Sequence, residues 1–255
     1  MKLHQLCSLV FLFALSAALA AETQTKPEAE AIEELEVVTV NGVTDPAFLP
    51  YASALKALAA FDKHRALAPA AMPRFKLVLK QQTIDPSCAA LALGLVGSEG
   101  AINIPLAADG SFTVPHETPL VGEGADLLLN RSRSLYRVFP DIRSPGVPGN
   151  ARRLGDLRLE CEMIWSYLKA ELGLVTRTTL VALGGACHTG LATFTFRAPA
   201  RLSGAALVFG DRREALTARR LPNNGLGYAP PLHDRSWPDD TLVEFESAPV
   251  MAGVE

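Results

Sequence analysis

Alternation of apolar with polar or small residues recurs in about nine segments of this chain, and it constrains the fold more than any other feature. In residues 74–80 (RFKLVLK), Phe75, Leu77 and Leu79 alternate with Lys76, Val78 and Lys80. Successive side chains of a β-strand point to opposite faces, so this pattern predicts a strand with one buried face. The repetition predicts a mainly β chain: a β-sandwich-type domain or domains with two or three short peripheral helices.

Further strands are expected along the chain, bounded by turn-forming residues. Asp109-Gly110 between two alternating segments predicts a β-hairpin. The expected strands are CAALALGLVG (88–97), the two arms of INIPLAADGSFTVP (102–115), ADLLLN (125–130), SLYRVFP (134–140), TTLVAL (178–183), LATFTF (191–196), GAALVFG (204–210) and TLVEFES (241–247).

Residues 75–115, and PLAADGSFTVP (105–115) above all, resemble carboxypeptidase-regulatory-like or transthyretin-type β-sandwich domains. Those domains end a hairpin with a D-G-x-F segment. The resemblance implies an accessory module without catalysis of its own. EELEVVTVNG (33–42) is similar to a short stretch near the mature N-terminus of TonB-dependent outer-membrane receptors, but a plain edge strand is the preferred interpretation.

A helix is predicted in DPAFLPYASALKALAAFDKHRALAP (45–69), with Asp45 as a cap and Pro46 or Pro50 in the first turn. His64 near its end is expected to be a solvated cap. Apolar residues follow each other at spacings of three and four, as one face of a helix requires. These residues are Phe48, Tyr51, Leu55, Leu58 and Phe61.

Two alternatives compete over residues 157–172. Leu157, Leu159, Cys161 and Met163 alternate as a strand would, whereas Leu157, Cys161, Ile164, Leu168 and Leu172 follow helical spacing. A strand to Met163 and a short helix from Ile164 to Leu172 are favoured. On that strand Glu160 and Glu162 would lie on the hydrated face, and the Arg-Arg pair at 152 is expected to be solvated.

The first 20 residues have the three parts of a secretory signal peptide, with a basic start, an apolar core and Ala18-Leu19-Ala20 before the cut. The apolar run Leu9–Leu15 is far shorter than the ~20 residues that span a bilayer. The sequence therefore predicts cleavage after Ala20, a periplasmic or secreted protein and no transmembrane segment after cleavage. Residues 21–44 are expected to form an acidic tether and a possible edge strand.

The rest of the chain divides into an expected helix plus β-sandwich-like unit, 45–140, and a second β-rich unit with one helix, 141–255. Residues 21–36 hold six Glu and one Lys, a net charge of −5 compared with −3 for the whole chain, so the folded part is nearly neutral. Nothing in it forms a basic stripe with aromatic residues, which argues against nucleic acid. A protein or saccharide partner in the cell envelope, of unknown identity, is expected.

The segment GGACHTG (184–190) places Cys187 beside His188 behind two glycines. In an oxidising compartment, Cys161 and Cys187, 26 positions apart, are predicted to form a disulfide, with the glycines adjusting the backbone. Cys88, at the start of an apolar strand, is expected to be a buried thiol.

No catalytic site is predicted, because neighbours on an extended chain point apart and His188 could not activate Cys187. His188, His233 and Asp234 are the alternative site. No H-E-x-x-H, paired C-x-x-C or nucleotide-binding motif is present, so neither a metal nor a cofactor is expected. The favoured function is a non-catalytic binding or envelope-structural module, and the alternative is a periplasmic hydrolase using His188, His233 and nearby acids.

Overall fold

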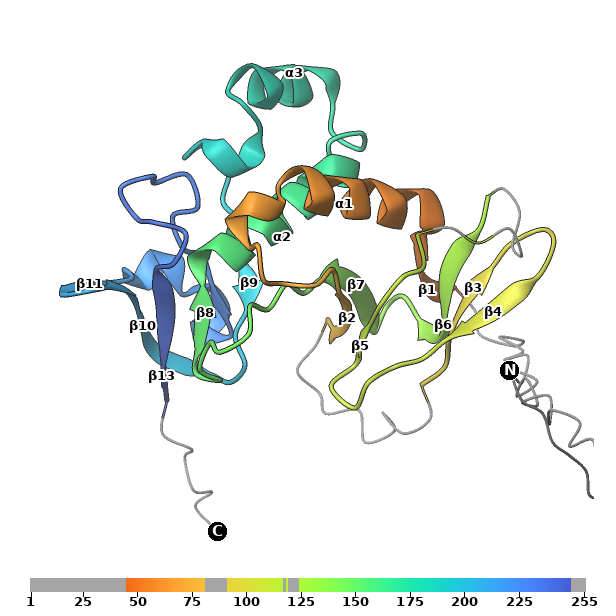
Figure 1. The fold of residues 1–255 in the computed structure, drawn as a ribbon, viewed down its shortest axis with the longest axis horizontal. Coiled ribbons are helices and arrows are strands. Elements are labelled where there is room, and N and C mark those ends of the chain that lie inside the picture. The colour runs from red at the N-terminus through yellow and green to blue at the C-terminus, as the bar shows by residue number, and fades with distance from the viewer. Residues whose placement is uncertain (1–44, 81–90, 117, 119–123, 249–255) are drawn as a thin grey trace, which may run out of the picture. The chain divides into compact units, whose positions relative to one another are not determined.

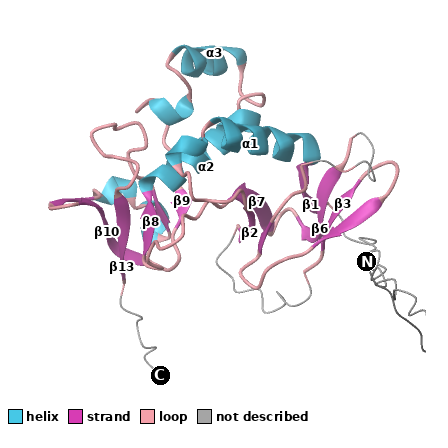
Figure 2. Cartoon of the chain, viewed as in Figure 1, coloured by secondary structure: helices cyan, strands magenta, loops and turns pink. Residues whose placement is uncertain are grey.

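The computed structural model describes residues 45–80, 91–116, 118 and 124–248. Within these ranges, strands in four antiparallel sheets confirm the expectation of a mainly β chain (Figures 1 and 2). The predictions of the signal peptide, the tether, the edge strand at 33–42 and a buried thiol at Cys88 concern residues outside these ranges.

Two sheets, the helix α1 (Tyr51–Lys63) and one side of the helix α2 (Leu154–Leu168) surround the first hydrophobic core. One sheet has the order β1-β6-β3-β4 and the other β5-β2-β7. The elements are β1 (Pro46–Pro50), α1 (Tyr51–Lys63), η1 (Arg65–Leu67), β2 (Phe75–Leu79), β3 (Leu93–Val96), β4 (Ala101–Ile104), β5 (Ser111–Phe112), β6 (Asp126–Ser132) and β7 (Tyr136–Pro140). α1 buries Ala54, Ala57, Leu58 and Phe61 against this core.

The helix begins later than its predicted span, because residues 46–50 pair with β6 as a strand. The expected cap at Asp45 is wrong, because Asp45 precedes β1; Pro50 is the N-cap residue and lies just before the first turn rather than in it. The predicted hairpin at Asp109-Gly110 is also corrected. The turn forms, with Gly110 at a φ of 76°, but β4 pairs with β3 and β5 pairs with β2. The turn thus leads from one sheet to the other.

The second core lies among the remaining elements. The sheet β11-β10-β13-β8 and the two-stranded sheet β12-β9 contribute to it. The elements are β8 (Ala151–Arg153), α2 (Leu154–Leu168), α3 (Leu174–Ala182), η4 (Ala186–His188), β9 (Phe196–Arg197), β10 (Leu202–Phe209), β11 (Arg212–Ala215), η5 (Ala218–Arg220), α4 (Pro222–Gly225), β12 (Gly227–Tyr228) and β13 (Leu242–Ser247).

The favoured strand at 157–163 is wrong: these residues belong to α2, which packs beside α1 (Figure 1). Residues four apart lie on the same side of a helix, and residues two apart lie on nearly opposite sides. Leu157 and Cys161 accordingly face the second core, whereas Leu159 and Met163 face the first. α2 is therefore a central helix rather than a peripheral one.

The strand predicted at 178–183 is also wrong, because these residues lie mostly in α3. None of the residues of α3 is buried, and Leu174, Val175 and Val181 are 67%, 79% and 56% exposed. The strand predicted at 191–196 is reduced to the short β9, which pairs with β12.

Candidate functional site

A cavity of about 710 Å³ opens beside α2 and is the main candidate site, called here the apolar cavity. Small-molecule sites in proteins commonly enclose about 300 to 1,000 Å³ behind mostly apolar walls. The apolar wall consists of Val78, Phe139, Pro140, Ile164, Trp165, Leu168, Leu172, Leu180, Ala186, Ala192, Phe194, Phe196, Ala198, Pro199, Tyr228 and Phe245.

Three aromatic rings from separate strands form one part of this wall. The β9–β12 pairing sets Phe196 opposite Tyr228, with ring centroids 5.7 Å apart. Tyr228 then meets the edge of Phe245 from β13 at 4.7 Å. Aromatic pairs at these separations are favourable beyond their buried area, so they help to stabilise this part of the wall.

The predicted disulfide between Cys161 and Cys187 is confirmed, and it fixes another part of the wall. The Cα atoms are 5.9 Å apart. Gly184 and Gly185 before it have φ values of 85° and 109°, which residues with a side chain rarely adopt. The bridge ties η4 to α2 and so holds Ala186 at the cavity.

A buried ion pair lies in the wall between these parts. Arg152 Nη2 of β8 is 2.5 Å from Glu160 Oε1 of α2, and both side chains are almost fully buried. The backbone of Ile142 contacts both partners: its amide donates to Glu160 Oε1 at 2.6 Å and its carbonyl accepts from Arg152 at 2.9 Å. These contacts correct two expectations, because neither Arg152 nor Glu160 is solvated.

Burial dominates the electrostatics of this pair. Removal from water raises the pKa of the Glu160 carboxyl to about 7, although Arg152 opposes the shift. Removal from water alone would lower the pKa of Arg152, but attraction to Glu160 and Asp141 and the hydrogen bond to Glu160 raise it, so the guanidinium stays charged. Burial also raises the pKa of Tyr228 to about 12, so its hydroxyl keeps its proton.

Two polar atoms of the cavity-lining residues have no hydrogen-bond partner among the described residues. They are Nε of Arg152 and the hydroxyl of Tyr228. Buried polar groups in proteins nearly always have a partner. Both atoms lie below the accessible surface, so they mark a polar and incompletely hydrogen-bonded part of the cavity wall rather than an exposed ligand contact.

Asp141 adds a second ion-pair group to the same wall. Its carboxylate accepts from Arg74 at 2.6 Å and from Arg143 at 3.0 Å. Burial alone would raise the pKa of Asp141, but the attraction of Arg143, Arg152 and Arg74 outweighs it and lowers the pKa below 3.8. A lowered pKa adds stability that is present above the ordinary value and is lost as the pH falls through the folded value.

We therefore expect Asp141→Asn to lower the free energy of unfolding by about 1.5 to 3 kcal/mol at pH 7, the usual contribution of hydrogen bonds to a charged group. As the pH falls below 3.8 the difference from the wild type should shrink, because the wild type then progressively loses the stability that its ionised carboxyl adds. Urea unfolding at pH 7, 4 and 2.5 measures both effects. An undiminished difference at pH 2.5 would show that the ion pairs are not its source.

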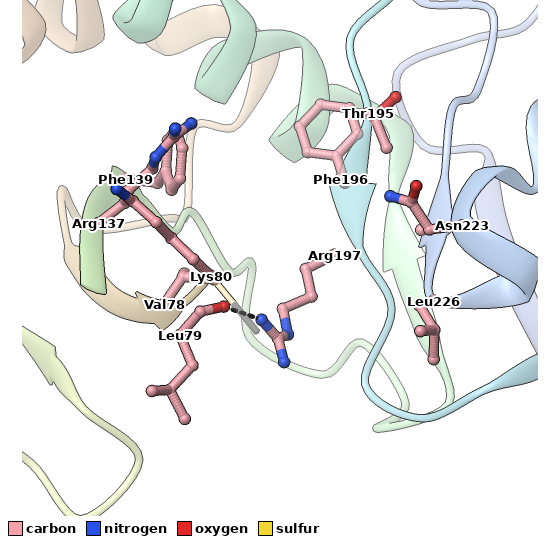
Figure 3. A pocket seen from close by; sticks show the side chains of 11 residues that line it. Val78, Leu79, Lys80, Arg137, Phe139, Thr195, Phe196, Arg197, Asn223 and Leu226 are labelled. Atoms are coloured by element: carbon pink, nitrogen blue, oxygen red, sulfur yellow. Dashed lines mark hydrogen bonds between the residues drawn. The ribbon is translucent and has the colours of Figure 1, made fainter. Parts of the chain in front are cut away.

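A second, more open hollow of about 540 Å³ adjoins the apolar cavity, and we call it the cationic hollow. Lys80, Arg137 and Arg197 are its charged lining residues (Figure 3). Arg197 extends from β9 and donates to the carbonyl of Leu79 in β2. The remaining lining residues are Val78, Phe139, Thr195, Phe196, Asn223, Leu226 and Gly227.

His188 and His233, the histidines of the alternative site, line neither the apolar cavity nor the cationic hollow. His188 Nε2 is 2.7 Å from Glu162 Oε1, and Arg235 contacts its Nδ1 at 2.8 Å. Arginine can only donate, so Nδ1 accepts and Nε2 carries the proton that it donates to Glu162. His233 lies against Gly190 beside a hollow of only about 20 Å³.

Asp234, the third residue of the alternative site, and His64 each have contacts of their own. Asp234 accepts from the amide of Ser236, and hydrogen bonds from Ser236 lower its pKa. Among the described residues, no hydrogen bond or ion pair joins Asp234 to His188 or His233. His64 is the C-cap residue of α1, and its Nε2 is 3.8 Å from Glu162. Glu162 thus links two histidines, although it was expected on a hydrated strand face.

Comparison of the chain with family models, curated proteins and solved structures found no match. In the part of the chain that the structure describes, no helix is long and apolar enough to cross a membrane. The same part contains no group of three or more His, Cys, Asp or Glu side chains arranged to hold a metal ion. The site must therefore be interpreted from its own geometry.

Proposed function

We propose that this chain is a non-catalytic binding module that holds a small, mostly apolar molecule in the apolar cavity. The observation that carries the proposal is the cavity itself. It has the volume and mostly apolar wall of a ligand site, and its polar lining residues include the buried group of Arg152, Glu160 and Tyr228 beside Lys76, Asp141, Arg143 and Arg197. In such sites the apolar wall supplies affinity, and the polar groups orient the ligand.

The expected export of the chain places this module in the periplasm or outside the cell. The shared core of the sheets β1-β6-β3-β4 and β5-β2-β7 supports a sandwich-type arrangement there. The resemblance of residues 75–115 to carboxypeptidase-regulatory-like domains agrees with an accessory role. A small-molecule ligand fits the enclosed cavity better than the protein or saccharide partner first expected.

The competing function, a periplasmic hydrolase, has the close contact between His188 and Glu162 in its support. A general base needs a ring nitrogen that can take a proton from the reacting group. Both nitrogens of His188 are occupied, one by Glu162 and the other by Arg235. Its thiol neighbour, Cys187, is bound in the disulfide. This arrangement favours a bridging role for His188.

Binding can be tested with N-phenyl-1-naphthylamine, an uncharged probe that fluoresces in apolar surroundings. We expect saturable binding to the full chain. Ala192 is half-buried at the cavity wall, so Ala192→Trp should fill the space and weaken binding at least tenfold. Ala182→Trp is the matched control, since Ala182 is exposed in α3 and lines neither hollow. An equal loss in both variants, or no saturable binding, would contradict the proposal.

A further inference from the structure

The apolar cavity and the cationic hollow form adjoining parts of one surface. Five residues line both of them: Val78, Phe139, Thr195, Phe196 and Arg197. A molecule with its apolar part in the cavity would therefore have the cationic hollow beside its other end.

The cations along this surface differ in whether a carboxylate lies within ion-pair distance. Deep in the cavity, Arg152 is matched by Glu160, and Arg143 at its wall by Asp141. Lys76, which also lines the cavity, is 3.2 Å from Asp109.

The cationic hollow differs because none of the described residues that line it is acidic. Lys80 and Arg137 are exposed there, and among the described residues neither has a carboxylate within ion-pair distance. Two unmatched cations in one hollow attract an anion, and guanidinium and ammonium groups are the usual partners of oxyanions. Arg197 already donates a hydrogen bond to the carbonyl of Leu79, so it holds β9 to β2 and is not counted as a cation for the anion.

We propose that the two hollows together bind an amphipathic oxyanion, with its apolar body in the apolar cavity and its headgroup at Lys80 and Arg137. This inference rests on the proposed function and adds the class of ligand to it. Because both cations are exposed, water and salt weaken their attraction, and the gain over an uncharged ligand should be moderate and salt-dependent.

The test measures displacement of N-phenyl-1-naphthylamine from the full chain by three molecules with the same twelve-carbon chain: dodecanoate, dodecyl phosphate and dodecan-1-ol. At low salt we expect dodecanoate or dodecyl phosphate to bind about tenfold more tightly than dodecan-1-ol. In 0.5 M NaCl this ratio should fall at least threefold, because the Debye length then shortens well below the ~10 Å of 0.1 M salt.

A matched pair of variants locates the effect. Lys80→Gln/Arg137→Gln should bring the anions to the affinity of dodecan-1-ol while leaving the uncharged alcohol unchanged. The control, Lys63→Gln/Arg201→Gln, removes one lysine and one arginine that are exposed and line neither hollow. Equal affinities of anion and alcohol for the wild type, or equal losses in both variants, would overturn the inference while probe binding still upholds the proposed function. Failure of the uncharged probe to bind would overturn both.

Discussion

Replacing Cys161 or Cys187 with serine should lower the free energy of unfolding by about 3 to 4 kcal/mol, the value expected for closing a loop of this length. The bridge joins residues 26 positions apart, so without it the unfolded chain gains the freedom of that loop. Both cysteines are nearly fully buried, which adds the cost of placing a serine hydroxyl in an apolar core. Because typical domains are stable by only 5 to 15 kcal/mol, this is a large share.

Urea unfolding of the single and double variants measures this effect. The double variant should cost little more than either single one, since both remove the same bridge. Cys88→Ser serves as the control and should cost less. Peptide mapping without reduction must show Cys161 linked to Cys187. A crosslink that contains Cys88 would contradict the assignment.

Replacing Arg152 with methionine should also be strongly destabilising, by about 3 to 5 kcal/mol at pH 8, because it leaves Glu160 buried without its partner. The loss should depend on pH. The pKa of Glu160 is about 7 with Arg152 present and should rise further without it. In the unfolded chain Glu160 ionises near its ordinary value of 4.5. Between these values the folded form binds more protons than the unfolded form, so the stability of the variant must fall as the pH rises.

Unfolding at pH 6 and pH 8 measures this difference, and two further variants control it. Arg152→Met/Glu160→Gln removes both charges but keeps an oxygen that accepts from the Ile142 amide, so it should recover at least half of the loss. Arg213→Met breaks an exposed pair with Glu244 and should change stability little. A double variant as unstable as Arg152→Met at pH 8 would show that the unpaired charge is not the cause.

The error at residues 157–163 has a physical explanation in α2. A helix between two cores carries two apolar stripes, and here Leu157 and Cys161 form one and Leu159 and Met163 the other. The two stripes together produce an alternation that is indistinguishable from that of a strand with one buried face. Such an alternation also predicts a hydrated face for the polar residues between the stripes, but Glu160 and Glu162 are buried.

The sequence pattern predicts the local structure more reliably where a segment has a single buried face. The alternation in β2 and β13 correctly predicted strands, and the Cys161–Cys187 pair followed from compartment and spacing. The apolar cavity could not be predicted in the same way. Its lining residues extend from position 76 to position 245, and tertiary packing, including that of α2 against β7, β8 and η4, brings them together.

The measurement that tests the central claim most directly is nuclear magnetic resonance of methyl-labelled protein with bound N-phenyl-1-naphthylamine. Intermolecular nuclear Overhauser effects would identify the methyl groups that touch the probe. Our account predicts contacts to Ile164, Leu168 and Leu180 in the apolar cavity. Contacts to Leu174 and Leu191 instead, which are 67% and 76% exposed, would place the probe on the outer surface and contradict the account.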